Sequence, residues 1–189
     1  MARIALDIDS TLHHYWDLLD GLAQEHFGVR LPYEEQHGWG IDRLEPSQLR
    51  RVIEESHSDE NIETAEPYPD AVETVRRWHG EGHWIHITSH RAEQTRDATT
   101  RWLGRIGMPF DDLHCSYDKV TRCVELEIDV LIDDSPVNLE SAREQGILGA
   151  TIIHPWNAVA VERGGVIGGR DWSDLAQLLE PVLERLART

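Results

Sequence analysis

The sequence predicts an α/β protein in which a three-layer, doubly wound parallel sheet carries a small helical cap after its first strand. Three observations predict this fold. Apolar, strand-like runs alternate with helical spacing from residue 67 onward. A mostly helical segment, residues 13–66, separates the first strand from this alternation. Polar residues follow three of the strands, where a parallel sheet would gather them at one edge. We expect residues 1–12 and 67–189 to form the core and residues 13–66 the cap.

The first strand and the helices of the cap come first along the chain. RIALDID, residues 3–9, predicts a buried strand because it is rich in β-formers and free of turn residues. Residues 14–29 have helical spacing, with Gly28 near their end as a stop. A second helix is expected at residues 46–56, followed by an acidic loop at residues 57–66.

The remaining elements follow the alternation. Helices are predicted from about residue 70, at 92–107, 119–127 and 137–146, and at the end of the chain, 171–189. Strands are predicted at 83–88, 111–116 and 149–155, and in IDVLIDDSP, residues 128–136, which has the clearest change from strand to loop.

The acidic composition limits the partners of the protein. The formal net charge is −17 at pH 7, which disfavours a nucleic acid polymer because such a surface repels phosphates. No apolar run approaches the length of a membrane span, and no signal-peptide region precedes Asp7, so we expect a cytoplasmic protein without a membrane partner. Cys115 and Cys123 are expected to be reduced thiols. The sequence leaves the oligomeric state open.

Three predicted strands end in polar side chains that suit one task. These side chains are Asp7 and Asp9, then Thr88 and Ser89, then Asp133 and Asp134. Parallel strands would bring all of them to the same edge of the sheet, the edge at which ligands bind in such folds. Carboxylate oxygens that converge there suit Mg²⁺, which prefers hard oxygen ligands in octahedral geometry.

These residues allow two other interpretations. An aspartate after a strand is often only the cap of the next helix, and Ser135 before Pro136 fits that role well. The eleven histidines suggest zinc, but His13, His14, His83, His86 and His90 form no convincing ligand set. We therefore favour magnesium.

Lys119 is the one lysine in the chain, against 17 arginines. A compact ammonium group can approach a phosphoryl oxygen and a carboxylate together, where a planar guanidinium needs more room. The chain's preference for arginine therefore suggests that position 119 requires a lysine. The alternative is that Lys119 lies on a helix surface and is a lysine only by chance.

These motifs together resemble those of the haloacid dehalogenase superfamily. Asp7-Ile8-Asp9-Ser10-Thr11-Leu12 is similar to its first motif, and HITSH, residues 86–90, to its second. Lys119 is similar to the third motif, and LIDDSP, residues 131–136, to the fourth. All four occur in the family's order and span most of the predicted core.

The resemblance implies a Mg²⁺-dependent phosphatase that works through an aspartyl-phosphate. Asp7 looks like the nucleophile and Asp9 like the general acid/base. Asp133 would join Asp7 and the backbone carbonyl of Asp9 on Mg²⁺, with Asp134 close by. Thr88, Ser89 and Lys119 would bind the phosphoryl oxygens. A nearby cation and Lys119 would also keep Asp7 ionised.

Within the superfamily, the chain is most similar to the 5'(3')-deoxyribonucleotidases, which implies a nucleoside monophosphate as the small phosphorylated substrate. The similarity lies in PYPDAVETVRRW (residues 67–78), SYDKV (116–120), VLIDDSP (130–136) and GWG (38–40). The chain departs from that family at Ser10-Thr11, where Gly-Val is usual, and at Ser135, where arginine is frequent.

The motifs indicate the reaction class, and the aromatic residues near the site bear on the substrate. Trp39 and Tyr15 are the residues expected to face a nucleobase, although such rings can also pack the cap against the core, the reading favoured for Trp16. One alternative is a phosphatase for a sugar phosphate or an amino-acid phosphate. A receiver-type signalling domain also uses acids, a hydroxyl and a lysine around Mg²⁺, but there the lysine comes last, whereas Lys119 precedes Asp133.

Overall fold

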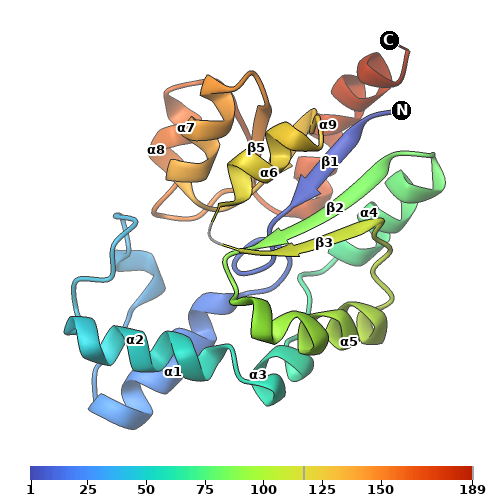
Figure 1. The fold of residues 1–189 in the computed structure, drawn as a ribbon. Coiled ribbons are helices and arrows are strands. Elements are labelled where there is room, and N and C mark those ends of the chain that lie inside the picture. Colours follow the sequence, from blue (N-terminus) through green and yellow to red (C-terminus); the bar gives the residue numbers. More distant parts are fainter. Residues whose placement is uncertain (117, 189) are drawn as a thin grey trace.

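The computed structural model describes residues 1–116 and 118–188. In that part of the chain six parallel strands form one sheet with the order β3-β2-β1-β4-β5-β6 (Figure 1). The strands are β1 (Arg3–Leu6), β2 (Trp84–Ser89), β3 (Asp112–Cys115), β4 (Val130–Ile132), β5 (Leu148–Ile152) and β6 (Val166–Gly169). The doubly wound parallel sheet predicted from the sequence is confirmed.

The register of the central strands places the polar strand ends in one row. Leu6 of β1 pairs with Ile87 of β2 and with Ile132 of β4. The next residue of each strand is therefore Asp7, Thr88 or Asp133. These three positions follow from strand pairing alone, before any side chain is considered.

Alternate residues of the strands face two separate helix layers. Ile4 and Leu6 pack in a core with α4 (Ala71–Gly80), α5 (Arg96–Ile106) and α9 (Trp172–Ala187). Ala5 and Leu131 pack instead with α6 (Lys119–Glu125) and α7 (Pro136–Glu144). Because successive side chains of a strand point to opposite faces, the sheet is covered on both sides. This confirms the three-layer arrangement.

Between β1 and α4 the chain forms α1 (Tyr15–Phe27), η1 (Tyr33–Glu35), α2 (Pro46–Ser56) and α3 (Asp59–Thr64). Figure 1 shows α1 and α2 beyond the carboxyl ends of β1 and β2, away from the sheet. Their apolar sides form a cluster of their own that includes Trp16, Leu19 and Val52. His13 and Pro67 pair in a short β-bridge, so the chain leaves the core and returns to it at adjacent points.

Residues 57–66 were expected to be a loop, and this expectation is wrong for most of them. They contain α3, which begins with the Ser58 hydroxyl accepting a hydrogen bond from the Asn61 amide at 3.4 Å. Ile62 is buried in the core cluster, and the Trp102 indole of α5 donates to the Ala65 carbonyl at 2.8 Å. The helix is short and acidic, so packing against α5 stabilises it more than its own propensity does.

The sequence did not predict β6, α8 (Ala158–Glu162) or the short turn η2 (Glu93–Thr95). Gly168 and Gly169 make β6 look like a loop. A Cβ atom at Gly169 would lie 2.5 Å from the Leu175 backbone nitrogen, so the strand needs glycine for the close approach of α9. Among the described residues, no helix is long and apolar enough to cross a membrane.

Candidate active site

The loop after β1 presents two aspartates to the carboxyl edge of the sheet. Asp7 continues the backbone pairing, since its amide donates to the Ile132 carbonyl at 2.8 Å. The chain then turns sharply, and the amides of Thr11 and Leu12 both donate to the Ile8 carbonyl. Ser10 has a φ of 60°, a left-handed conformation that favours glycine. The deoxyribonucleotidases that the sequence resembles usually have glycine at this position. The serine therefore keeps the turn at a cost in backbone strain.

Lys119 links the two central strand ends. It is the first residue of α6 and is 2 % exposed. Its ammonium group donates to Asp7 Oδ1 at 2.6 Å and to Asp133 Oδ2 at 2.8 Å. Burial works against the charged form, but the two carboxylates outweigh it and raise the pKa of Lys119 above its usual value. The lysine therefore belongs to the site and not to a helix surface.

Asp133 is held rigidly from the opposite side. The amide of Ser135 donates to its Oδ1 at 2.8 Å, and the Asn138 side-chain amide donates to both of its oxygens, at 3.2 and 3.0 Å. The Ser135 hydroxyl accepts from the Asn138 amide at 3.3 Å and Pro136 follows it, so the helix cap predicted there is confirmed. One turn of α7 thus orients the carboxylate.

Three buried carboxylates converge with one lysine between them. One ligand atom from each of Asp7, Asp133 and Asp134 lies within 4.8 Å of the others. Burial, together with the neighbouring acids, raises the pKa of Asp7 to about 7 and that of Asp134 well above its usual value. A divalent cation would offset this excess of negative charge, so the donor set fits a hard metal ion. No histidine belongs to this group in the described part of the chain.

Asp9 lies beside these acids but has different partners. The Arg91 guanidinium donates to both of its oxygens, at 2.7 and 3.2 Å. The Nε2 atoms of His13 and His57 lie 3.0 and 3.4 Å from them. Burial alone would raise the pKa of Asp9, but Arg91, His13 and His57 together hold it well below its usual value. Asp9 is therefore an ionised carboxylate that is fixed between core and insertion.

Thr88 and Ser89 lie at the end of β2, as predicted, but they are fully buried. Neither of them lines the cavity that the acids line. The Ser89 hydroxyl accepts a hydrogen bond from the Arg91 amide at 3.2 Å. The Thr88 hydroxyl has no hydrogen-bond partner among the described residues, which is unusual for a buried polar group.

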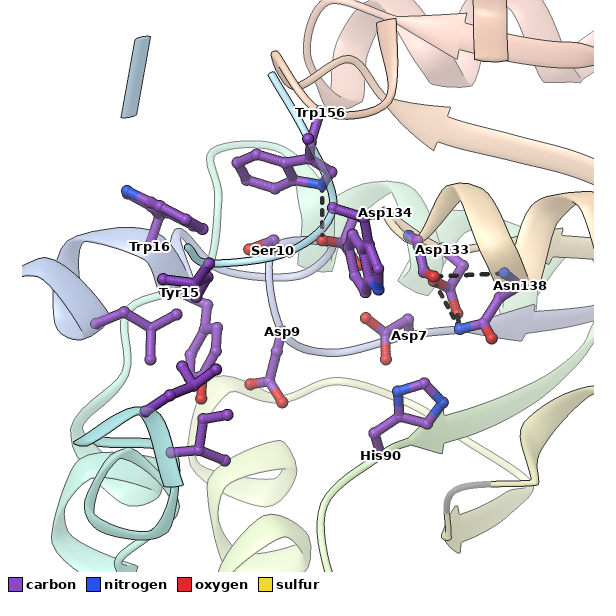
Figure 2. A pocket seen from close by; sticks show the side chains of 18 of the residues that line it. Asp7, Asp9, Ser10, Tyr15, Trp16, His90, Asp133, Asp134, Asn138 and Trp156 are labelled. Atoms are coloured by element: carbon purple, nitrogen blue, oxygen red, sulfur yellow. Dashed lines mark hydrogen bonds between the residues drawn. The ribbon is translucent and has the colours of Figure 1, made fainter. Parts of the chain in front are cut away.

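The acids lie at one end of a cavity of about 370 Å³ (Figure 2). The candidate residues that share it are Asp7, Asp9, Tyr15, Trp39, Lys119, Asp133 and Asp134. Its opposite wall comes mainly from α1, α2 and the loop between them, and its apolar side chains are Trp16, Leu19, Trp39, Ile41, Leu49 and Ile53. Trp39 is 46 % exposed, whereas Trp16 is buried and packs against the core residue Trp156. A charged end thus adjoins an apolar, aromatic end.

Sequence reasoning missed Arg91, Asn138, His57 and Trp156. Arg91 and Asn138 had a readable signal, because each follows a predicted strand end within a few residues. Trp156 follows the predicted strand at 149–155 in the same way. His57 had no such signal, since its place beside Asp9 depends on how the insertion folds back.

Comparisons with known proteins agree with this geometry. Residues 1–182 match the model of the family described as 5' nucleotidase, deoxy (pyrimidine), cytosolic type C protein. A protein of Oceanobacillus iheyensis that is named as a nucleotidase is 25 % identical to this chain over 154 residues. The match covers 75 % of this chain and 81 % of that protein. The "Putative nucleotidase" of Bacillus cereus is 28 % identical over 154 residues, 74 % of this chain and 79 % of that protein.

Solved structures show the same fold. A HAD family hydrolase of Deinococcus radiodurans with bound phosphate and sodium has a TM-score of 0.66 at 18 % identity, covering 97 % of this chain and 96 % of that one. The D,D-heptose 1,7-bisphosphate phosphatase of B. bronchiseptica, complexed with magnesium and phosphate, has a TM-score of 0.55 at 13 % identity, covering 95 % and 98 %. The family match spans nearly the whole chain, and the protein therefore belongs to this 5'-nucleotidase family.

Proposed function

We propose that the protein is a Mg²⁺-dependent phosphatase that hydrolyses nucleoside monophosphates of the 5'(3')-deoxyribonucleotidase type. The observation that carries this proposal is the two-ended cavity. Its charged end holds four carboxylates and a lysine, three of the carboxylates forming the converging group, and its other end is lined by aromatic and aliphatic side chains. A phosphoryl group suits the first end. A nucleobase suits the second, because every base has a flat π-face that can stack on an aromatic ring.

Asp7 is the proposed nucleophile. Its carboxylate oxygen would attack phosphorus, the bond to the ester oxygen would break, and an aspartyl-phosphate would form on Asp7. Lys119, 2.6 Å from Asp7, would stabilise the charge on the transferring phosphoryl oxygens. The Thr88 hydroxyl, which has no hydrogen-bond partner in the described part of the chain, is a second candidate for this task, while Ser89 already holds the turn at Arg91.

Asp9 is the proposed acid and base. In the first half of the reaction it would give a proton to the leaving alkoxide. In the second half it would take a proton from water, whose oxygen attacks phosphorus and releases phosphate from Asp7. The low pKa of Asp9 favours its ionised form, which suits the second half, since Arg91 stabilises the carboxylate.

The side chains of Asp7, Asp133 and Asp134, with the backbone carbonyl of Asp9, would hold Mg²⁺. When bound, the ion would supply Lewis-acid polarisation of the phosphoryl group and neutralise the buried acids. Asn138 and Lys119 would keep Asp133 oriented throughout.

Residues 13–66 are the proposed cap. Their helices α1 and α2 wall the apolar end of the cavity, and closure there would exclude water from the aspartyl-phosphate. Since α3 packs on α5 of the core, we expect the moving part of the insertion to lie before it.

The decisive experiment is a phosphatase screen with Mg²⁺ over deoxynucleoside monophosphates, ribonucleoside monophosphates, sugar phosphates and amino-acid phosphates. We expect the nucleotides to be hydrolysed best, activity to be lost in excess EDTA, and Asp7→Asn to abolish turnover in a folded protein. Asp9→Asn should retain slow phosphorylation, because acid/base catalysis contributes about 10²–10⁴-fold. Preference for a sugar or amino-acid phosphate would replace the nucleotide proposal. Full activity in EDTA would refute the metal dependence.

A further inference from the structure

Trp156 belongs to the core part of the chain, but its ring packs in the apolar cluster of the cap. It follows β5 in the segment 153–157, which the Asn157 side chain ties to the core through the carbonyls of Asp134 and Ile152, at 3.2 and 3.0 Å. Its indole is 6 % exposed and is part of the apolar cluster formed by the insertion. The residue therefore places a ring from the core part of the chain inside the apolar cluster of α1 and α2.

The indole is clamped from both sides. On the core side it stacks on His154 with ring centroids 4.5 Å apart and planes 7° apart. On the insertion side the centroid of its ring lies 5.2 Å from that of Trp16 and 5.6 Å from that of Tyr33, whose ring is nearly perpendicular to it. The Tyr33 hydroxyl lies 2.6 Å from His154 Nδ1, which closes the clamp.

The polar edge of the same indole points at the acid cluster. Its Nε1–H donates to Asp134 Oδ2 at 3.2 Å, the bond drawn in Figure 2. Asp133 next to it receives four hydrogen bonds, from Lys119, Ser135 and Asn138, which fix its carboxylate by themselves. Asp134 depends instead on the clamped indole, and so its orientation depends on the contact between core and cap.

We propose that Trp156 is a positioning residue for the cation: it holds the Asp134 carboxylate in its binding orientation while its ring forms the wall between the cation and the cap. The proposal rests on the carboxylate site under "Proposed function" but not on the nature of the substrate. A residue that hydrogen-bonds a metal-binding side chain commonly changes metal affinity by about 10–100-fold when it is lost. It follows that a ligand or a cap movement that shifts this indole also changes cation affinity.

The test measures binding of Mn²⁺ alone, from the electron paramagnetic resonance signal of the free ion, with no substrate present. Trp156→Phe keeps an aromatic ring but removes the N–H donor, and we expect it to weaken Mn²⁺ affinity by about 10–100-fold. Trp172→Phe is the matched control. It loses a buried indole N–H that donates to the Thr11 carbonyl at 2.8 Å, but Trp172 packs in the other core cluster and does not line the cavity, so this variant should bind Mn²⁺ within about twofold of the wild type.

A double-mutant cycle separates positioning from a general structural role. Asp134→Asn removes the charge through which Trp156 is proposed to act, so adding Trp156→Phe should then change Mn²⁺ affinity by less than about twofold. An equal loss in both backgrounds would overturn the proposal, as would a Trp156→Phe variant with wild-type affinity.

A second measurement needs no change at position 156. In protein labelled with ¹⁵N-tryptophan, Mg²⁺ should shift the indole N–H resonance that Asp134→Asn also shifts. If Asp134→Asn moves no indole resonance, or Mg²⁺ moves a different one, the proposal is wrong. Because no substrate enters either experiment, a failure of the nucleotide proposal would leave both results unchanged.

Discussion

At the scale of single residues, Lys119 shows how closely the site restricts side-chain shape. Its ammonium lies between Asp7 and Asp133 at hydrogen-bond distance from both, with almost no exposure. Lys119→Arg keeps the charge, but a planar guanidinium needs more room than this gap provides. We expect a loss of kcat/KM of at least about 100-fold, as for other single groups that stabilise a transition state.

The control for Lys119→Arg is Arg101→Lys, an exchange in the opposite sense at an exposed ion pair with Asp59 and Glu63. It should leave kcat/KM unchanged, because exposed ion pairs contribute little. Near-normal activity of Lys119→Arg would mean that the ammonium is not required at that position.

Arg91 allows a test of Asp9 as the proposed general base, through the pH dependence of activity. It holds the pKa of Asp9 well below the usual value, so its removal raises that pKa. A base must be ionised, and the acid limb of the kcat profile should therefore move to higher pH in Arg91→Met. The control is Thr99→Val, which removes another hydrogen bond of Arg91 but leaves the pair with Asp9 intact. An unmoved limb in Arg91→Met would exclude Asp9 as the titrating base.

The candidate residues were predictable to different degrees for a physical reason. Asp7, Thr88 and Asp133 lie at or directly after the ends of three strands in a fixed register, so strand prediction alone places their backbones in one row. The burial of Thr88, and the approach of His57 to Asp9, depend on side-chain packing between segments distant in sequence. Periodicity carries no information on such contacts.

At the scale of elements, β6 shows why a strand can look like a loop. Its glycines lower the strand propensity, yet a Cβ at Gly169 would lie 2.5 to 2.6 Å from the backbone and Cβ of Leu175 at the start of α9. Gly169→Ala should therefore destabilise the protein by about 1–3 kcal/mol, the usual cost of overpacking. Gly21→Ala, within α1 and with open space around it, should instead stabilise it by about 0.5–1 kcal/mol. Urea unfolding measures both, and equal effects would contradict this account of β6.

Elements with a strong pattern of their own were predicted well. β4 and the cap of α7 are fixed by an apolar run, two acids and Ser-Pro, all adjacent in sequence. In contrast, α3 has a weak pattern and is stabilised by its contact with α5, so its sequence suggested a loop. Local signals predict an element when its stability is local.

Trp39, in the loop between α1 and α2, allows a test of the proposed nucleotide substrate. Trp39 lines the cavity and is 46 % exposed, so a ligand can cover its ring. Trp39→Ala should lower kcat/KM for a nucleoside monophosphate by roughly 10-fold or more, if stacking worth at least about 1.4 kcal/mol is lost. It should affect a simple aryl phosphate much less. Equal losses on both substrates would mean that the tryptophan is structural.

At the scale of the whole molecule, the acid cluster makes stability depend on pH, and we expect a bound cation to change that dependence. Without a cation, burial raises the pKa values of Asp7 and Asp134, so the folded protein holds protons that the unfolded chain has released. Stability from this source is therefore lost as pH rises through about 7, the pKa of Asp7. His86 and His154, whose pKa values burial lowers to about 4, act in the opposite sense below pH 6.5.

When stability is measured with and without Mg²⁺ at the same pH, the contributions of His86 and His154 cancel, because these residues do not belong to the carboxylate cluster. The cation competes with protons for Asp7 and Asp134, so its affinity rises as these groups lose their protons. The increase in Tm on adding Mg²⁺ should then grow from pH 6 to pH 8. At 100 times Kd the gain in the free energy of unfolding is about 2.7 kcal/mol. Asp134→Asn, with one carboxylate fewer, should reduce both the gain and its dependence on pH. A gain that is the same at pH 6 and pH 8 would mean that the cation does not bind where these carboxylates meet.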